Sequence, residues 1–169
     1  MALAKDYDSV MGRSNEIMKK ALGLDYNDFE SGSVAFDYEA LMKATGYTLD
    51  EVAKIQARTA VGNTPLIELR NLSALSRKYA KPGYGARIFA KDEAANASGS
   101  FKARRAACAV AHAKKLGYKG VIAATSGNYG AAVASQAAMQ GLECIIVQEC
   151  YDSRGVGQPE IVEKARKCE

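Results

Sequence analysis

The chain has 169 residues, which is enough for one domain and an extension but not for two full domains. Lysine and arginine number 23 and aspartate and glutamate 19, and the resulting net charge of +4 is spread along the sequence. Without a basic block, a nucleic-acid partner is not expected. The longest apolar runs, such as residues 144–147, are far too short to cross a bilayer. We therefore expect a globular protein independent of membranes, and the N-terminal sequence, which lacks an apolar signal core, predicts a cytoplasmic location.

Cysteine and histidine are too few and too scattered to indicate a metal site or a catalytic triad. The only histidine, His112, lies among alanines and lysines, which is typical of a helix surface. A metal site or a Ser-His or Cys-His pair would have to use that one residue. The cysteines form no CxxC pair, so reduced thiols are expected rather than a disulfide framework. They are Cys108, Cys144, Cys150 and Cys168.

Residues 1–60 have the pattern of a helical N-terminal extension. Apolar residues at helical spacing predict a helix over 6–22, which Gly23 would close. The letters TLDE form a capping box at the start of a second helix, predicted over 48–58. Nothing in this segment points to a particular chemistry.

Residues 61–169 alternate between strand and helix patterns. The later predicted strands are apolar throughout rather than alternating, which indicates a parallel sheet covered by helices on both faces. The series stops without a closing strand, so we expect residues 61–169 to be the front part of a longer protein. Strands are predicted within GNTPLIEL and over 86–93, 120–124 and 142–148, and helices over 71–79, 101–116, 129–140 and 158–167.

A lysine stands at the start of the predicted helix 101–116, in the sequence SGSFK that ends at Lys102. One interpretation is an ordinary surface lysine after a serine cap. However, a cation at a helix N-terminus faces the positive end of the helix dipole, at a cost of about 0.3–1 kcal/mol. The same field would lower the pKa of the amine, which suits a lysine that must be neutral to react with a carbonyl group.

A second candidate site follows the predicted strand 120–124, in the segment TSGNYG. In parallel α/β sheets, ligands bind beyond the carboxyl ends of strands, where the next helix presents free backbone N–H groups. Hydroxyls at Thr125 and Ser126, the amide of Asn128 and the flexible Gly127 would form a cup for a carboxylate or a phosphate. The alternative is a plain strand–helix turn with a serine or asparagine cap. The segment matches neither GxxxxGK[ST] nor GxGxxG, so nucleotide binding is the poorer interpretation.

Three motifs, GNTPL, SGSFK and TSGNYG, occur in this order across strand–helix units. Over residues 62–167, this combination resembles the fold type II pyridoxal-phosphate enzymes, the family of tryptophan synthase β, cysteine synthase, threonine synthase and threonine dehydratase. The resemblance implies the α/β, parallel-sheet architecture of that family, incomplete here and preceded by the helical extension.

The resemblance also implies roles for individual residues. Lys102 would carry pyridoxal 5′-phosphate covalently and would later move a proton at the substrate Cα. Asn128 would hydrogen-bond the pyridine 3′-oxygen, and Ser98 and Ser100 would shape the turn that aims the lysine. The substrate α-carboxylate would be held by the loop residues Thr125, Ser126, Gly127, Asn128 and Tyr129.

A narrower resemblance rests on KDYDSVM, EIMKKALGLDY, SGSFKARRAA and IIVQECYDSRGVGQPEI. Over residues 5–169 these segments are similar to the β subunits of 2-amino-4-oxopentanoate thiolases, which belong to ornithine degradation. Such enzymes cleave their amino-acid substrate with coenzyme A to acetyl-CoA and alanine. The resemblance implies a small α subunit as partner, an oligomeric enzyme and direct attack by coenzyme A. No nucleophilic cysteine is then needed, and only Cys150, at the end of a predicted strand, lies near the expected cleft.

Some parts of the family site are absent from these 169 residues. In the family, the glycine-rich loop that binds the cofactor phosphate and the residue facing the pyridine nitrogen come later in the chain. No glycine-rich run follows the TSGNYG segment before the last predicted helix; its glycines there are isolated, with Gly155 and Gly157 in SRGVG and Gly141 at the end of a predicted helix. We therefore expect the chain alone to be inactive and poorly soluble, with exposed apolar sheet surface.

Two alternatives stay open at this point. The chain could belong to another lyase or synthase of the same fold, such as a threonine synthase or a threonine dehydratase. It could also be a non-catalytic interaction module, although such a module would need neither Lys102 nor the SGNYG segment.

Overall fold

The structure is a computed structural model that describes residues 7–32, 35–166 and 168. The chain forms two compact units, Met1–Glu51 and Val52–Glu169. The boundary between these two units falls inside a helix. The division of the chain into domains over residues 1–60 and 61–169 stays a prediction. None of the helices in the described residues is long and apolar enough to cross a membrane.

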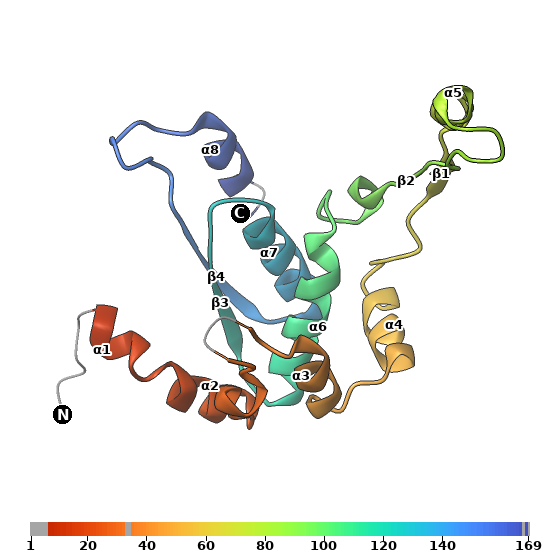
Figure 1. Cartoon of the computed structure of the whole chain (residues 1–169). Helices are drawn as coiled ribbons and strands as arrows, with labels where there is room; N and C mark the ends of the chain where they lie inside the picture. The colour runs from red at the N-terminus through yellow and green to blue at the C-terminus, as the bar shows by residue number, and fades with distance from the viewer. Residues whose placement is uncertain (1–6, 33–34, 167, 169) are drawn as a thin grey trace. The chain divides into compact units, whose positions relative to one another are not determined.

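The first unit is built mainly of short helices, drawn in red to orange in Figure 1. The predicted helix over 6–22 is wrong as one element, because the chain forms α1 (Tyr7–Met11) and α2 (Ser14–Leu22). The break falls at Gly12, and glycine is about 1 kcal/mol less favourable than alanine in a helix interior. The predicted end is confirmed, since Gly23 closes α2 with a φ of 72°. The first residue of the predicted helix lies outside the described residues.

A capping box opens α4 (Leu49–Ala57), as the sequence predicts. The Thr48 amide donates to Glu51 Oε2 at 2.8 Å, and the Glu51 amide donates to Thr48 Oγ1 at 3.2 Å. Each side chain thus satisfies a backbone donor that the first helical turn leaves free. Aspartate caps open two further elements of this unit, Asp25 the 3₁₀ helix η1 (Tyr26–Phe29) and Asp37 α3 (Tyr38–Ala44).

The second unit begins with two antiparallel strands rather than strands of a parallel sheet. β1 (Leu66–Glu68) pairs with β2 (Phe89–Lys91), and Ile67 lies opposite Ala90. The parallel arrangement predicted from the later strands therefore does not extend to these two strands. They form a sheet of their own, separate from the later strands.

The helix between these strands explains why β2 is shorter than the predicted strand 86–93. In α5 (Arg70–Tyr79), Ser76 Oγ accepts from the Ala86 amide at 3.0 Å. Ser73 Oγ accepts from the Ile88 amide at 2.8 Å. The first residues of the predicted strand therefore bond to helix side chains instead of to a neighbouring strand.

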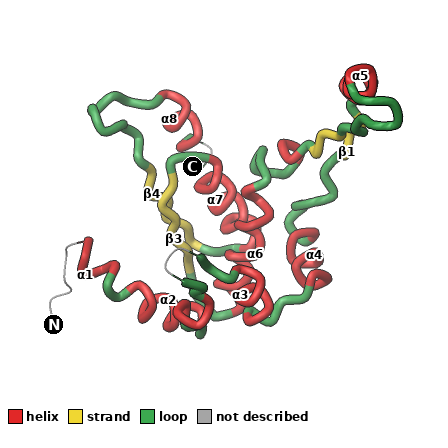
Figure 2. The backbone as a smooth tube through the Cα atoms, viewed as in Figure 1, coloured by secondary structure: helices red, strands yellow, loops and turns green. Residues whose placement is uncertain are grey.

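The parallel part of the prediction is confirmed by β3 (Gly120–Thr125) and β4 (Glu143–Gln148), which pair in parallel along their whole length. They are joined by α7 (Asn128–Gln140), which ends at Gly141 with a φ of 73°. The same unit contains α6 (Lys102–Lys115), and Figures 1 and 2 show it beside α7. The remaining elements are the 3₁₀ helix η2 (Glu93–Ala95) and α8 (Pro159–Ala165); the last residue of the predicted helix 158–167 lies outside the described residues.

The two faces of the β3–β4 pair differ in burial. One face packs against α6 and α7 through small residues, among them Ala106 and Ala132, which are fully buried. On the other face Ile122 is 70% exposed and its register partner Ile145 is 62% exposed. The described residues thus cover only one face of this pair, and not both faces as the sequence predicts. The expectation of exposed apolar sheet surface is confirmed.

Candidate active site

Lys102 is the first residue of α6, as the sequence predicts, and its side chain is half-buried. Its Nζ lies 4.6 Å from the centroid of the Phe101 ring. No side chain caps this end of the helix. Within the described residues, Lys102 makes no ion pair, so its amine is not tied to a carboxylate.

Two hydroxyls next to Lys102 are buried without a hydrogen-bond partner in the described part of the chain. They are the Oγ atoms of Ser98 and Ser100, and Ser100 is only 8% exposed. A buried polar group without a partner costs about 1–3 kcal/mol, and native proteins rarely leave one in place without a reason. These hydroxyls therefore mark a place where a polar group of a ligand would find donors and acceptors.

The TSGNYG segment forms the turn between β3 and α7. The Thr125 hydroxyl accepts from the Gly127 amide at 3.0 Å and from the Gly130 amide at 3.3 Å. This side chain thus holds the turn in shape rather than pointing freely at a ligand. Ser126 and Asn128 are exposed, and the N-cap residue of α7, Gly127, has no side chain to cap the helix. Thr125 takes the N–H group of Gly130, whereas those of Asn128 and Tyr129, which no helix carbonyl can reach, remain available to an anion.

The two candidate segments are brought together by the packing of α6 on α7. The guanidinium of Arg105 lies 4.7 Å from the centroid of the Tyr129 ring, which joins the first turn of α6 to the TSGNYG loop. Gly130 allows α7 to approach β3 and β4 closely, because a Cβ there would collide with Thr125 Cγ2 and lie 3.0 Å from Ile146 Cγ2. Alanine-rich helices and one glycine thus place the lysine and the loop at neighbouring helix ends.

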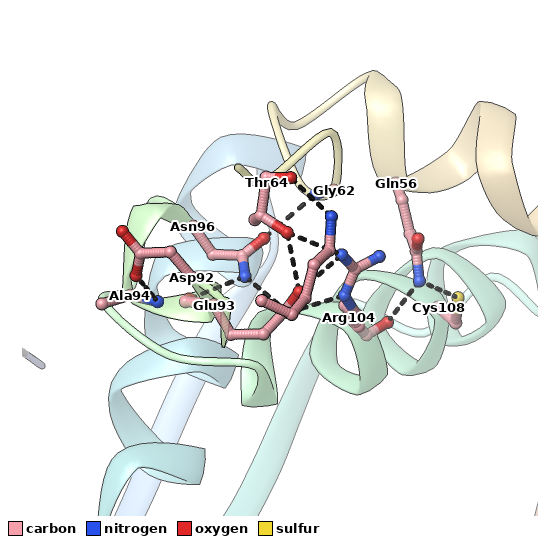
Figure 3. A network of polar contacts seen from close by, with 10 residues as sticks. Gln56, Gly62, Thr64, Asp92, Glu93, Ala94, Asn96, Arg104 and Cys108 are labelled. Carbon is pink, nitrogen blue, oxygen red and sulfur yellow. Dashed lines mark hydrogen bonds and ion pairs between the residues drawn. The ribbon is translucent and has the colours of Figure 1, made fainter. Parts of the chain in front are cut away.

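A polar network that the sequence analysis did not find surrounds the first turns of α6 (Figure 3). At its centre, Arg104 Nε donates to Glu93 Oε2 at 2.7 Å and Arg104 Nη2 donates to Glu93 Oε1 at 2.8 Å. Thr64 Oγ1 donates to Glu93 Oε1 at 2.7 Å, and Asn96 Nδ2 donates to Glu93 Oε2 at 3.0 Å. The network gives a structural role to the GNTPL motif, since Asn96 Oδ1 also accepts from the Gly62 amide at 3.0 Å.

The hydrogen bonds of this network perturb the acidity of Glu93. Chiefly the Arg104 guanidinium, together with the Thr64 hydroxyl, lowers the pKa of the Glu93 carboxyl from 4.5 to about 2. The bond to Glu93 raises the pKa of Arg104 in turn. Sequence spacing does not predict this cluster, because Thr64 and Arg104 are 40 residues apart.

The structure gives none of the cysteines the features of a reactive nucleophile. All four are free thiols, and Cys150 Sγ lies 3.7 Å from the carbonyl oxygen of Gln148. Burial raises the pKa of the Cys108 thiol in α6 and of the Cys144 thiol in β4. A raised thiol pKa disfavours the nucleophilic thiolate.

Two hollows of the second unit lie away from Lys102. One, of about 290 Å³, lies between α6, α7 and β3 and is lined by apolar side chains with Tyr129 at its edge. The other, of about 410 Å³, is lined by Ile55, Arg58, Thr59, Ala111, Lys114, Lys115, Met139 and Gln140.

Residues 57–168 match the family model described as "Pyridoxal-phosphate dependent enzyme". The match covers most of the chain, which therefore belongs to this family of pyridoxal-phosphate dependent enzymes. The resemblance inferred from GNTPL, SGSFK and TSGNYG is thereby confirmed.

Individual relatives narrow the comparison. The chain is 75% identical, over 99% of its length, to the "2-amino-4-ketopentanoate thiolase beta subunit" of Acetoanaerobium sticklandii, and 66% identical to a protein of the same name from an unknown prokaryotic organism. In both cases it spans 36% of the relative's length. It is also 45% identical to the threonine synthase of Halalkalibacterium halodurans, over 51% of this chain and 22% of that enzyme. The narrower resemblance to thiolase β subunits is confirmed.

The residues of the candidate site fit pyridoxal phosphate in part. Lys102 supplies an amine without a carboxylate partner in the described residues, and the unpartnered hydroxyls of Ser98 and Ser100 lie next to it in the chain. The N-terminus of α7 offers donors to an oxyanion. No glycine-rich phosphate loop is among the 169 residues, so the fit concerns the end of the cofactor that reacts with the lysine.

Proposed function

We propose that the protein containing this chain is a pyridoxal-phosphate dependent thiolase β subunit. It would cleave 2-amino-4-oxopentanoate with coenzyme A to acetyl-CoA and alanine, in the breakdown of ornithine. One observation carries this proposal: Lys102 and the TSGNYG loop, which is proposed to bind a carboxylate, lie at the starts of the packed helices α6 and α7. The chain that contains them is 75% identical to a protein named for this activity.

Lys102 is the proposed attachment point and base. When bound there, pyridoxal phosphate supplies an electron sink for bonds broken at or near the substrate Cα. Lys102 would hold the cofactor through its Nζ, and the same atom, when free, would accept the substrate Cα proton and later return it. Within the described residues no carboxylate pairs with this amine, which leaves it accessible to the cofactor.

The TSGNYG loop is the proposed orienting group. Backbone N–H groups at the start of α7, with the exposed side chains of Ser126 and Asn128, hold the substrate α-carboxylate. Fixing this carboxylate points the Cα–H bond at the lysine, an orientation effect that lowers the barrier. Thr125 contributes by keeping the turn in shape, and Gly127 and Tyr129 complete the loop.

The proposed assembly follows from the same relatives. A protein named as a β subunit implies a second, α subunit, and we propose a small α subunit as the partner here. The thiolate of coenzyme A would attack the C4 carbonyl directly, without a cysteine nucleophile. The C3–C4 bond would then break to release acetyl-CoA, its electron pair would be left on C3, and C3 would take up a proton to give alanine. We place the enzyme, as an oligomer, in the cytoplasm.

Borohydride reduction in the presence of pyridoxal phosphate, followed by peptide mass mapping, tests the attachment. We expect one pyridoxyl group on Lys102 in the full-length protein and none at that position in Lys102→Ala. Labelling spread over many surface lysines, with Lys102 unmodified, would contradict the catalytic assignment.

A second assay separates thiolase from synthase activity. The threonine synthase relatives keep that alternative open, although they match only about half of this chain. The complex with the α subunit is incubated with 2-amino-4-oxopentanoate and coenzyme A, or with phosphohomoserine. Acetyl-CoA supports the proposal, whereas threonine from phosphohomoserine supports the alternative.

A further inference from the structure

The network around Glu93 joins three chain segments that are far apart in sequence (Figure 3). Thr64 comes from the GNTPL motif, Glu93 from η2, and Arg104 from α6. Gln56 adds a fourth segment, because its Nε2 donates to the Arg104 carbonyl oxygen at 3.2 Å. The start of α6 is thus held from several directions by polar bonds.

These bonds are shielded more than ordinary surface contacts. Thr64 is 6% exposed and Asn96 is 3% exposed, and the side chain of Glu93 is 23% exposed. A two-pronged bond between a guanidinium and a carboxylate also fixes the relative orientation of the two planes. The geometry is therefore more restrictive than that of a single exposed ion pair.

The apolar contacts of the same turn cannot supply this orientation. Val61 packs against Ala103 and Ala107, which are fully buried. Alanine side chains let the segments approach closely, but they are short and carry no directional group. The packing of Ala106 and Val110 against α7 and β3 holds α6 from one side, and the bonds of Arg104 add directional contacts that restrict its rotation about its axis.

Lys102 lies two residues before Arg104, so their side chains point about 200° apart around the helix. A bond that fixes Arg104 on one side of α6 consequently sets where the Lys102 side chain points on the other side. A small rotation of the helix would move the amine away from a bound substrate.

We propose that Arg104 and Glu93, supported by Thr64, are positioning residues that aim Lys102 at the reacting carbon. The inference rests on the proposed function, in which Lys102 is the cofactor lysine and the base. None of the three residues touches substrate in this proposal, and all act through the orientation of α6.

The test compares the rate at which pyridoxal phosphate attaches to Lys102 in variants of the full-length protein. Reduction and peptide mapping measure the amount attached at each time. Arg104→Gln should slow attachment about 100-fold, the size of effect expected when a reacting group is misplaced by about 1 Å. Arg104→Lys keeps the charge but loses the two-pronged geometry, so it should restore only part of the rate. Thr64→Val, which keeps the shape, should slow attachment without unfolding the protein.

Arg87→Gln is the matched control. Arg87 forms an ion pair with Glu68 at 3.2 Å next to the β1–β2 sheet, and no hydrogen bond connects that pair to α6 in the described residues. Its removal should leave Lys102 labelling unchanged. Turnover adds a second readout, because misaimed Lys102 should lower kcat in Arg104→Lys with little change in KM.

The outcomes separate the two proposals. If Arg104→Gln and Thr64→Val stay folded and label Lys102 as fast as Arg87→Gln does, the positioning role is wrong while the proposed function stands. If labelling falls only in proportion to the unfolded fraction measured by circular dichroism, the network is merely structural and the proposal is overturned. If Lys102 is not labelled in the wild-type protein, both proposals fail.

Discussion

The Glu93 carboxylate makes the stability of the protein depend on pH in a defined window. Its pKa is lowered from 4.5 to about 2, because Arg104 and Thr64 bond to the ionised form. A depressed pKa contributes stability that is fully present above the unfolded-state pKa and is lost as the pH falls through the folded-state pKa. We expect urea unfolding midpoints to fall between pH 4.5 and 2 more steeply in the wild type than in Glu93→Gln. Parallel curves would show that the ion pair adds no stability.

The unpartnered hydroxyl of Ser100 allows folding and ligand binding to be separated at one residue. Since no described residue bonds to this Oγ, Ser100→Ala should raise the free energy of unfolding by about 1 kcal/mol or leave it unchanged. The same variant should retain pyridoxal phosphate less well if the hydroxyl faces the cofactor, which equilibrium dialysis measures.

Ser73→Ala is the control for that measurement. Ser73 is also buried, but its Oγ accepts from the Ile88 amide, so its loss should cost about 1 kcal/mol of stability. Equal destabilisation by both variants would mean that Ser100 does have a partner in the folded protein.

At the scale of elements, the two glycines of the TSGNYG turn have opposite roles. A Cβ at Gly130 would meet Thr125 and Ile146, whereas a Cβ at Gly127 would meet open space in an extended backbone. Gly130→Ala should lower the free energy of unfolding, because overpacking costs about 1–3 kcal/mol and outweighs the helix preference of about 1 kcal/mol for alanine. Gly127→Ala should leave the urea midpoint unchanged and raise KM for the amino-acid substrate, since it adds a methyl group in open space within the loop proposed to hold the carboxylate.

If Gly127→Ala is the more destabilising of the two, the packing account of this turn is wrong. Equal KM values for Gly127→Ala and the wild type would instead remove Gly127 from the proposed carboxylate site.

The elements that local sequence predicts well are those whose signals lie within a few residues. The capping box at Thr48 and the closing glycines depend on short spacings, and the parallel β3–β4 pair follows from two apolar strands joined by one helix; the structure contains all of them. The short β2 was missed because serines of α5 take its first amides, a contact across 10 to 15 residues. Lys102 and the TSGNYG turn lie where expected, at the starts of α6 and α7.

The sequence alone does not predict the hydrogen-bond network that holds the start of α6. The Arg104–Glu93–Thr64 cluster needs the fold of the second unit to bring its members together, and each residue alone has an ordinary polar context. GNTPL was noticed as a family motif, but its role in bracing α6 emerges only from the hydrogen bonds of Thr64 and Gly62.

At the scale of the whole molecule, neighbouring residues on opposite faces of β4 test how the exposed sheet surface behaves. Ile145 is 62% exposed, whereas Ile146 packs against the core between β3, α6 and α7. Apolar patches of this kind promote association. In the 169-residue chain, Ile145→Lys should leave the unfolding free energy within about 0.5 kcal/mol and reduce self-association, measured by sedimentation velocity. Ile146→Lys should cost more than about 2 kcal/mol, because it buries an unpaired charge.

The same pair of variants, made in a relative of full length, shows whether that surface stays exposed in the larger protein. The chain spans 36% of the length of the thiolase β subunits that it matches. If the additional length covers β4, Ile145→Lys becomes as destabilising there as Ile146→Lys, because both charges are then buried without a partner. If Ile145→Lys remains neutral in the longer protein, the face is open to solvent or to another subunit. Comparing its effect with and without the α subunit then separates these two cases, since a covering subunit would lose affinity for the lysine variant.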